Sequence, residues 1–174
     1  MTPDQYCQHL LARHGSSTHY SLLFLAPEQR RAATALFALS RELDDAVEGS
    51  ADPGVAHARL AWWMQELVNL FDGTPQHPIT RALAPFVATY DLALDRFVPA
   101  LQARHRLLEM PRFADFEALR QHCYSLSGVF GEMAARMSGS RQATTWARGG
   151  QLALGVRMIR LMRVPAEASF RSGT

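Results

Sequence analysis

The stretch Pro27–Glu48 is the feature that most constrains how this chain can fold. Its apolar residues recur at helical spacing, and Leu36, Leu39 and Leu43 form one stripe. The proline at its start suits the first turn of a helix, and Gly49 suits a helix end. The sequence therefore predicts one long helix that buries its leucine stripe against other elements.

The rest of the chain is typical of further helices joined by short turns. The predicted helices cover residues 3–14, 54–71, 115–137 and 142–162, with one or two more between residues 78 and 109 and a short apolar helix before residue 27. Pro85 and Pro99 are expected to break or kink the helical sequence around them. No stretch alternates polar and apolar residues as a half-buried strand would, and no internal repeat is visible. The predicted fold class is all-α, with several helices around one core.

Composition narrows the class of protein. The 174 residues are 48% hydrophobic and 20% charged, which indicates one ordinary soluble domain. Cys7 and Cys123 are too few for a disulfide framework, and the histidines show no zinc spacing. The N-terminus is too polar for a signal peptide, and the apolar runs are too short to span a bilayer. We therefore expect a cytoplasmic protein, with contact at a membrane surface left open.

The basic residues are all arginines and are unevenly spread. Residues 136–174 hold seven of the 18 arginines and one of the 16 acidic residues. A basic segment of this kind can contact a nucleic acid or a membrane surface. Only Trp146 and Phe170 place aromatic rings among these arginines. The sequence therefore does not favour a nucleic acid as the partner.

Carboxylates cluster at the end of the long helix. Asp44 and Glu48 lie four residues apart and so share one helix face, with Arg41 a turn earlier on the same side. Gly49 and Ser50 follow, so no cation on the next turn offsets the repulsion between the two carboxylates. This pattern favours an ion such as Mg²⁺, which takes oxygen ligands. The alternative is a solvated acidic helix end.

Four blocks of sequence follow one another in a specific order. They are Pro3-Asp4-Gln5-Tyr6-Cys7, the run from Ser21 to Asp45, the run from Ala58 through Trp63 and Glu66 to Leu83, and Cys123-Tyr124 with Ser127-Gly128-Val129-Phe130-Gly131. Together they resemble the squalene/phytoene synthase family, and the first block is most like its bacterial presqualene diphosphate synthases. The resemblance implies an isoprenoid-synthase-type helical bundle that is C-terminally incomplete. Residues 1–163 would form this family-like domain, and residues 164–174 a tail without family character.

The resemblance also implies a reaction. The family joins two prenyl diphosphates head to head, beginning with ionisation of an allylic diphosphate, and Mg²⁺ and arginines neutralise the leaving group. The resemblance assigns Asp44 and Glu48 to Mg²⁺, with Asp45 in support. The family usually has Asp where this chain has Glu48. Arg41 matches a diphosphate contact, and its alternative is an ion pair with Asp44 or Asp45.

Further positions are implied to bind the substrate. Ser16 and Ser17 match a turn that hydrogen-bonds the diphosphate, with helix capping as the alternative. A second set on a later helix matches the family's pocket: His122, Leu126, Ser127 and Gly131. The family has Tyr where this chain has His122. Two glycines three residues apart on that helix leave a flat face, for an isoprenoid tail or for a packed helix.

The second acidic motif of the family is missing from the aligned position. Its usual form is a Gln, a polar residue and then Arg-Asp, with another Asp four positions on. The alignment places Arg157 at the Gln and Arg160 at the polar residue. The two aspartates fall on Val164 and Ala168. A frameshift or truncation explains this ending, and a divergent short protein is the alternative.

Three interpretations follow from these patterns. The first is a prenyltransferase that converts farnesyl diphosphate to presqualene diphosphate or squalene, or a phytoene-type enzyme, with Mg²⁺ as cofactor. The second is a non-catalytic member of the family that acts as an assembly or protein-interaction factor, and the third is an inactive fragment. The retained carboxylates favour descent from an enzyme. The missing second motif predicts little or no synthase activity for these 174 residues.

Overall fold

The computed structural model describes residues 1–13, 17–109 and 112–162. Within these ranges the chain is helical and has no strand, so the predicted all-α class is confirmed. The elements are α1 (Pro3–Arg13), α2 (Ser17–Leu22), α3 (Pro27–Glu48), α4 (Pro53–Phe71), α5 (Pro78–Leu83), the 3₁₀ turn η1 (Ala84–Phe86), α6 (Leu94–Glu109), α7 (Phe116–Cys123), the π-helical turn η2 (Tyr124–Gly128), α8 (Val129–Met137) and α9 (Ala143–Met162). The predicted tail after Arg163 lies outside the described residues.

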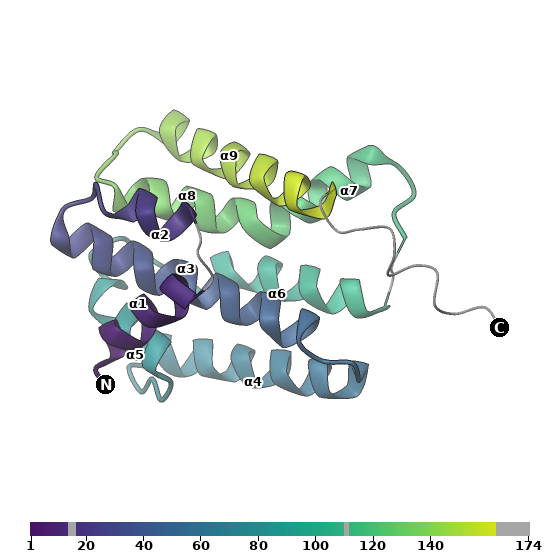
Figure 1. The fold of residues 1–174 in the computed structure, drawn as a ribbon, viewed down its shortest axis with the longest axis horizontal. Coiled ribbons are helices and arrows are strands. Elements are labelled where there is room, and N and C mark those ends of the chain that lie inside the picture. The colour runs from purple at the N-terminus through teal and green to yellow at the C-terminus, as the bar shows by residue number, and fades with distance from the viewer. Residues whose placement is uncertain (14–16, 110–111, 163–174) are drawn as a thin grey trace.

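Helix α3 is the central element of the bundle. It contacts α1, α2, α4, α5, α6 and α8, and Figure 1 shows it between α4 below and the α8–α9 pair above. The predicted stripe of Leu36, Leu39 and Leu43 is fully buried. Buried alanines, among them Ala32 and Ala35, let the neighbouring helices approach α3 closely. The long amphipathic helix predicted from the sequence therefore organises the core.

Two helical stretches of the sequence are divided in the structure. The expected break near Pro85 is present, because residues 78–109 form α5, η1 and α6, and Pro85 lies in η1. Pro99 lies inside α6 without ending it, and buried Phe97 and Ala100 on either side hold this helix in the core. The predicted helix over residues 115–137 contains the π-helical turn η2, a feature often found at functional sites.

Glu66 fastens α4 to the loop that leads into α5. Its carboxylate, 2% exposed, accepts hydrogen bonds from the backbone N–H groups of Gln76 (2.8 Å) and His77 (2.7 Å) and from the Thr80 hydroxyl. Burial favours the neutral acid, but the hydrogen bonds, with that of the His77 amide the strongest, hold the pKa of Glu66 below its ordinary value. Glu66 therefore ties α4 to the start of α5, which packs on α1 and α3.

Helices α8 and α9 touch at two glycines. A Cβ on Gly131 would lie 2.3 Å from the backbone oxygen of Gly149, and a Cβ on Gly149 would lie 2.5 Å from that of Gly131. The atoms that would clash belong to helical backbone on both sides, so no side chain can move to relieve them. The packed helix considered above for the flat glycine face is therefore α9.

We expect Gly131→Ala to lower the free energy of unfolding by about 2–3 kcal/mol, because the added methyl group forces the two helices apart. Urea denaturation of the purified chain measures this. Gly155→Ala is the matched control within α9, because nothing lies within 4 Å of a Cβ there. The control should be stabilised by up to about 1 kcal/mol through its better helix propensity. Equal effects of the two substitutions would contradict the glycine contact.

The remaining features of the fold agree with the composition. Cys7 and Cys123 are free and buried, and burial raises the pKa of the Cys7 thiol to about 12. Among the helices that the structure describes, none combines the length and the apolar character that crossing a membrane requires. Thr2 and Gln5 form a capping box at the start of α1, because the side chain of each accepts a hydrogen bond from the other's backbone N–H.

Candidate functional site

A groove of about 460 Å³ lies between α2 and α3 on one side and α8 and α9 on the other. Much of its wall is apolar and comes from Phe37, Phe130, Ala134, Leu152, Ala153 and Val156. Its polar lining includes Asp44, Arg157 and Arg160, which come from the C-terminal parts of α3 and α9. Along α9 the wall extends from Gly149 to Arg160, a distance of about 17 Å. The groove is thus long, apolar over most of its length and charged at one end.

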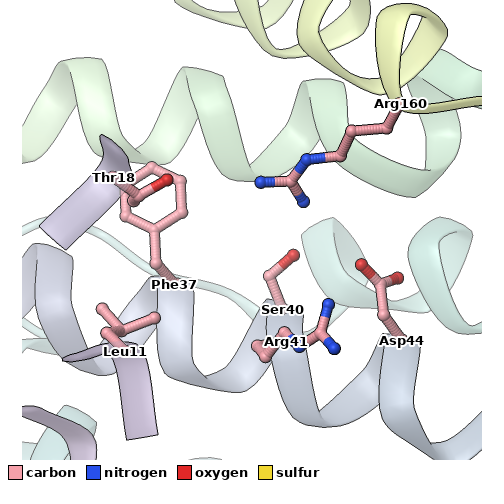
Figure 2. Close-up of a pocket in the computed structure, with 7 residues that line it drawn as sticks. All are labelled: Leu11, Thr18, Phe37, Ser40, Arg41, Asp44 and Arg160. Carbon is pink, nitrogen blue, oxygen red and sulfur yellow. The ribbon is translucent and has the colours of Figure 1, made fainter. Parts of the chain in front are cut away.

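A second cavity of about 330 Å³ adjoins the charged end of the groove. Figure 2 shows its lining: Leu11, Thr18, Phe37, Ser40, Arg41, Asp44 and Arg160. Arg41 and Asp44 come from α3, and Arg160 comes from the facing α9. No ion pair with a described residue engages Arg160. Guanidinium groups from two helices therefore border one cavity.

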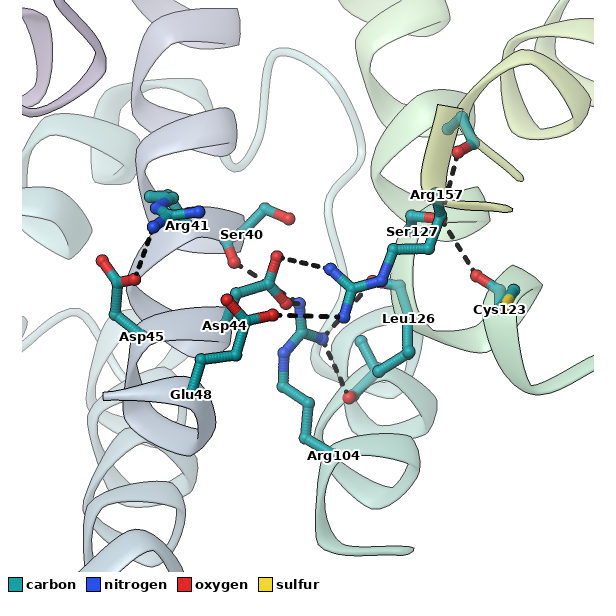
Figure 3. A network of polar contacts seen from close by, with 12 residues as sticks. Ser40, Arg41, Asp44, Asp45, Glu48, Arg104, Cys123, Leu126, Ser127 and Arg157 are labelled. Atoms are coloured by element: carbon teal, nitrogen blue, oxygen red, sulfur yellow. Dashed lines mark hydrogen bonds and ion pairs between the residues drawn. The ribbon is translucent and has the colours of Figure 1, made fainter. Parts of the chain in front are cut away.

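Asp44 is bound by two arginines from distant parts of the chain. Its Oδ1 accepts a hydrogen bond from Nη2 of Arg104 at 2.6 Å, and its Oδ2 accepts one from Nη1 of Arg157 at 2.8 Å (Figure 3). All three residues are buried. The ion pairs join α3 to α6 and to α9, which supply Arg104 and Arg157. We call these three residues the Asp44 cluster.

Arg104 is the most enclosed member of the cluster, at 1% exposed. It also donates to the backbone oxygens of Ala100 (3.0 Å) and Leu126 (3.4 Å), so the π-helical turn η2 contributes an acceptor. Burial lowers the pKa of Arg104 from its ordinary value, and the adjacent charge of Asp44 opposes that shift. Arg104 was not predicted as a site residue from the sequence. The available signal was its position in line with buried Phe97 and Leu101 on α6, at helical spacing.

The other acidic residues of α3 have different environments. Asp45 pairs with Arg41 at 2.8 Å, so the ion pair given above as the alternative role of Arg41 is present. Glu48 is 56% exposed and lies 3.8 Å from Nη2 of Arg157. The prediction that nothing offsets the charges of Asp44 and Glu48 was wrong. The cations come from α6 and α9, which local sequence cannot show.

This donor set does not fit Mg²⁺. A magnesium ion bound to Asp44 would lie beside two buried guanidinium groups, because both oxygens of Asp44 accept hydrogens from arginines, and Asp45 is paired with Arg41. In the part of the chain that the structure describes, no three or more His, Cys, Asp or Glu side chains are arranged to hold a metal ion. The assignment of Asp44, Asp45 and Glu48 to Mg²⁺ thus rests on the resemblance alone, and the arrangement of the described residues does not support it.

The predicted substrate-binding residues are only partly brought together. Ser127 and Gly131 line the groove, and the Ser127 hydroxyl donates to the backbone oxygen of Cys123 at 2.9 Å. Leu126 is buried and supplies its backbone oxygen to Arg104. Ser16 and the side chain of Ser17 lie outside the described part of the structure.

His122 lies in a separate pocket. It lines a cavity of about 250 Å³ with Arg106, Arg112, Phe113, Gln121 and Ser125. Its ring packs on Phe113, with centroids 4.8 Å apart, and its buried Nε2 has no hydrogen-bond partner among the described residues. Burial, together with the charges of Arg106, Arg157 and Arg104, lowers the pKa of His122 to about 4. Its proposed role in substrate binding stays a prediction.

The lowered pKa of His122 predicts a pH-dependent stability. A histidine in an unfolded chain titrates near pH 6.5, whereas the pKa of His122 in the folded chain is about 4. The neutral ring therefore contributes its full stability above pH 6.5, and this contribution is lost as the pH falls toward 4. We expect a loss on the order of 3 kcal/mol in the free energy of unfolding, measured by urea denaturation at a series of pH values. His122→Gln should flatten this dependence, and identical curves for the two proteins would contradict it.

Comparison with known proteins identifies the family. The profile of the squalene/phytoene synthases matches residues 11–168. This chain belongs to the squalene/phytoene synthase family. The matched residues include those of the groove, the Asp44 cluster and the π-helical turn, so these features lie within the family domain.

Relatives in sequence are phytoene synthases. The chain is 29% identical over 154 residues to the chloroplastic phytoene synthase of Daucus carota, a match that covers 86% of this chain and 39% of that protein. It is 27% identical over 133 residues to the 15-cis-phytoene synthase of Synechococcus elongatus, covering 76% of this chain and 43% of the relative. The chain thus spans about two fifths of the length of these relatives.

Solved structures of the family show the same fold. A dehydrosqualene synthase crystallised with a ligand has a TM-score of 0.80 at 17% identity, over 92% of this chain and 56% of that chain. A squalene synthase from Alicyclobacillus acidocaldarius has a TM-score of 0.77 at 22% identity, over 92% of this chain and 60% of its own. The predicted isoprenoid-synthase-type bundle is therefore confirmed. This chain corresponds to little more than half of each solved structure.

Proposed function

We propose that this chain supplies a prenyl diphosphate-binding part of an enzyme that joins two prenyl diphosphates head to head. Membership of the squalene/phytoene synthase family supports this reaction class. The observation that carries the proposal is the groove, whose apolar wall continues into a cavity bordered by Arg41 and Arg160. A prenyl diphosphate has the matching form, with an apolar tail and an anionic head.

Different residues would bind the two ends of the ligand. Arg41 and Arg160 would hold the diphosphate, because a guanidinium group donates two parallel hydrogen bonds to phosphate oxygens. These charges would also stabilise the diphosphate as it leaves. Phe37, Phe130 and Leu152 would cover the prenyl tail and keep water from the allylic carbocation.

We further propose that these 174 residues turn over their substrate weakly. The aligned positions of the second acidic motif carry Val164 and Ala168, which have no ligand oxygens. The carboxylate of Asp44 is also engaged by two arginines. Both features reduce the positive charge that a metal-assisted mechanism could gather around the leaving group. Incubation with farnesyl diphosphate should therefore yield little presqualene diphosphate or squalene.

Binding of a non-reacting analogue tests the proposal. Farnesyl thiodiphosphate should bind the chain at least tenfold more tightly than inorganic pyrophosphate, because its tail buries apolar surface in the groove. Isothermal titration calorimetry measures both affinities. Equal affinity for the two ligands would contradict a prenyl-binding groove.

A matched pair of substitutions on α9 sharpens this test. Leu152, 71% exposed, lines the groove, whereas Leu161, 44% exposed, does not. Leu152→Asp should weaken the binding of farnesyl thiodiphosphate by tenfold or more and leave pyrophosphate binding unchanged, while Leu161→Asp should change neither. Equal losses in both variants would place the ligand elsewhere.

A non-catalytic, partner-binding role is the second candidate. It is favoured by the engagement of Asp44 with Arg104 and Arg157, because a carboxylate used as a structural counter-ion is not free for metal-assisted chemistry. Under this interpretation neither farnesyl thiodiphosphate nor pyrophosphate binds measurably. The calorimetric experiment therefore separates the two functions.

A further inference from the structure

We infer that Arg157 takes the role of a divalent cation at Asp44, because its guanidinium group is the counter-ion of that carboxylate. The site would then bind a diphosphate through arginines, without a metal ion. This inference concerns the site of the proposed function. It rests on that function only in taking the bound anion to be a diphosphate. It concerns the second cavity and the Asp44 cluster, which share Asp44.

Each oxygen of the Asp44 carboxylate lies against an arginine. Magnesium binds carboxylate oxygens at about 2.1 Å. Nη2 of Arg104 lies 2.6 Å from Oδ1 of Asp44, and Nη1 of Arg157 lies 2.8 Å from Oδ2. Each oxygen keeps a second lone pair, but a metal ion bound there would lie beside a buried guanidinium group of the same sign. Repulsion between the two cations, or displacement of a guanidinium group that would then be buried without its counter-ion, is strongly unfavourable.

The net charge of the residues around Asp44 favours an anion over a cation. The site holds four arginines and three carboxylates, a net charge of +1: Arg41, Arg104, Arg157 and Arg160 against Asp44, Asp45 and Glu48. A divalent cation would raise this charge further in a region where Asp44, Arg104 and Arg157 are buried. An anion would lower it. The electrostatics of the site therefore favour an anion alone over a metal ion.

The second cavity offers arginine donors to a diphosphate. Arg160 borders the second cavity from α9 and has no ion pair with a described residue. Arg41 borders the same cavity from α3, and its ion pair with Asp45 is made by Nη2. Guanidinium groups with free donors are suited to phosphate oxygens. Arg41 and Arg160 thus border the cavity with donors for one diphosphate, and Arg157 adds a positive charge at Asp44.

The wild-type chain provides the first test. In EDTA, isothermal titration calorimetry should detect binding of inorganic pyrophosphate. In the absence of pyrophosphate, electron paramagnetic resonance should detect no Mn²⁺ bound to the chain at an equimolar concentration. If pyrophosphate binds only when a divalent cation is added, or if the chain binds Mn²⁺ stoichiometrically, the inference is overturned.

Arg157→Gln provides the second test, because it removes one cation from Asp44 and places there the residue of the family motif. Pyrophosphate affinity in EDTA should fall about 10- to 100-fold, and Mn²⁺ binding should appear. Arg160→Gln is the matched control, since Arg160 does not contact Asp44. It should weaken pyrophosphate binding without creating Mn²⁺ binding. Mn²⁺ binding by both variants or by neither would contradict the role of Arg157, and circular dichroism establishes that each variant is folded.

The outcomes also separate this inference from the proposed function. If pyrophosphate binds in EDTA but farnesyl thiodiphosphate binds no more tightly, the metal-independent anion site stands and the prenyl-binding groove fails. If farnesyl thiodiphosphate binds only with Mg²⁺ present, the proposed function stands and the inference fails.

Discussion

Replacing Asp44 by alanine should lower the free energy of unfolding by about 3–5 kcal/mol. The substitution leaves Arg104 and Arg157 buried without the carboxylate that accepts their hydrogens, and an unpaired buried charge is among the costliest defects in a folded protein. This loss is a large part of the 5–15 kcal/mol that stabilises a typical domain. Urea denaturation at neutral pH measures it.

Asp45→Ala is the matched control for this prediction. Asp45 is the next residue on α3 and is also paired with an arginine, but its partner Arg41 and Asp45 itself are each about one third exposed. Water and ions screen such a pair, so its loss should cost at most about 1 kcal/mol. If Asp44→Ala and Asp45→Ala have equal effects, Asp44 is not a buried counter-ion.

A triple variant tests the cause of the loss. Asp44→Leu combined with Arg104→Met and Arg157→Met removes all the charges of the Asp44 cluster at once. Replacing a whole buried ion cluster by apolar residues is often neutral or stabilising. The triple variant should therefore be more stable than Asp44→Ala alone. If it is no more stable, lost packing and not unpaired charge explains the effect of Asp44→Ala.

Replacing Glu66 by alanine should lower the free energy of unfolding by about 3 kcal/mol. The change removes the acceptor of two backbone N–H groups and of the Thr80 hydroxyl, and it leaves these donors without their partner in a largely buried site. The loop before α5 should then lose its attachment to α4. Amide hydrogen exchange at Gln76 and His77 should accelerate along with the global loss of stability.

The pH dependence and a control complete this prediction. Because the folded pKa of Glu66 is lowered, its ionised form contributes stability at pH values above the ordinary glutamate range, and this contribution is lost as the pH falls through the folded pKa. Glu66→Gln should retain some hydrogen bonds and lose less than alanine. Gln65→Ala, at the neighbouring exposed position on α4, should change stability by less than about 0.5 kcal/mol. Exchange at Gln76 that is unchanged in Glu66→Ala would refute the attachment.

The helices were predictable because their ends carry local signals. The predicted helix Pro27–Glu48 matches α3 at both ends, since a proline begins it and a glycine follows it. The division of residues 78–109 into α5, η1 and α6 was harder to predict. Pro85 lies in η1 between the helices, but Pro99 lies inside α6, where burial in the core outweighs the lost hydrogen bond.

The candidate site was predictable only along one helix. Helical spacing placed Asp44, Glu48 and Arg41 near one another, but Arg104 and Arg157 lie 60 and 113 residues from Asp44 in sequence. Their contacts arise from how α6 and α9 pack on the core, which the local pattern does not contain. The expectation of an uncompensated carboxylate failed for this reason.

The Asp44 cluster also has a consequence for how the protein opens. Its three residues come from α3, α6 and α9, which lie in different thirds of the chain. Detachment of α9 would expose Arg157 to water but would leave Asp44 with a single partner inside the core. This penalty couples the release of α9 to the loosening of α3 and α6, so the three helices are expected to exchange their amide hydrogens as one cooperative unit. A polar contact that spans the chain in this way turns separate helices into a single folding unit.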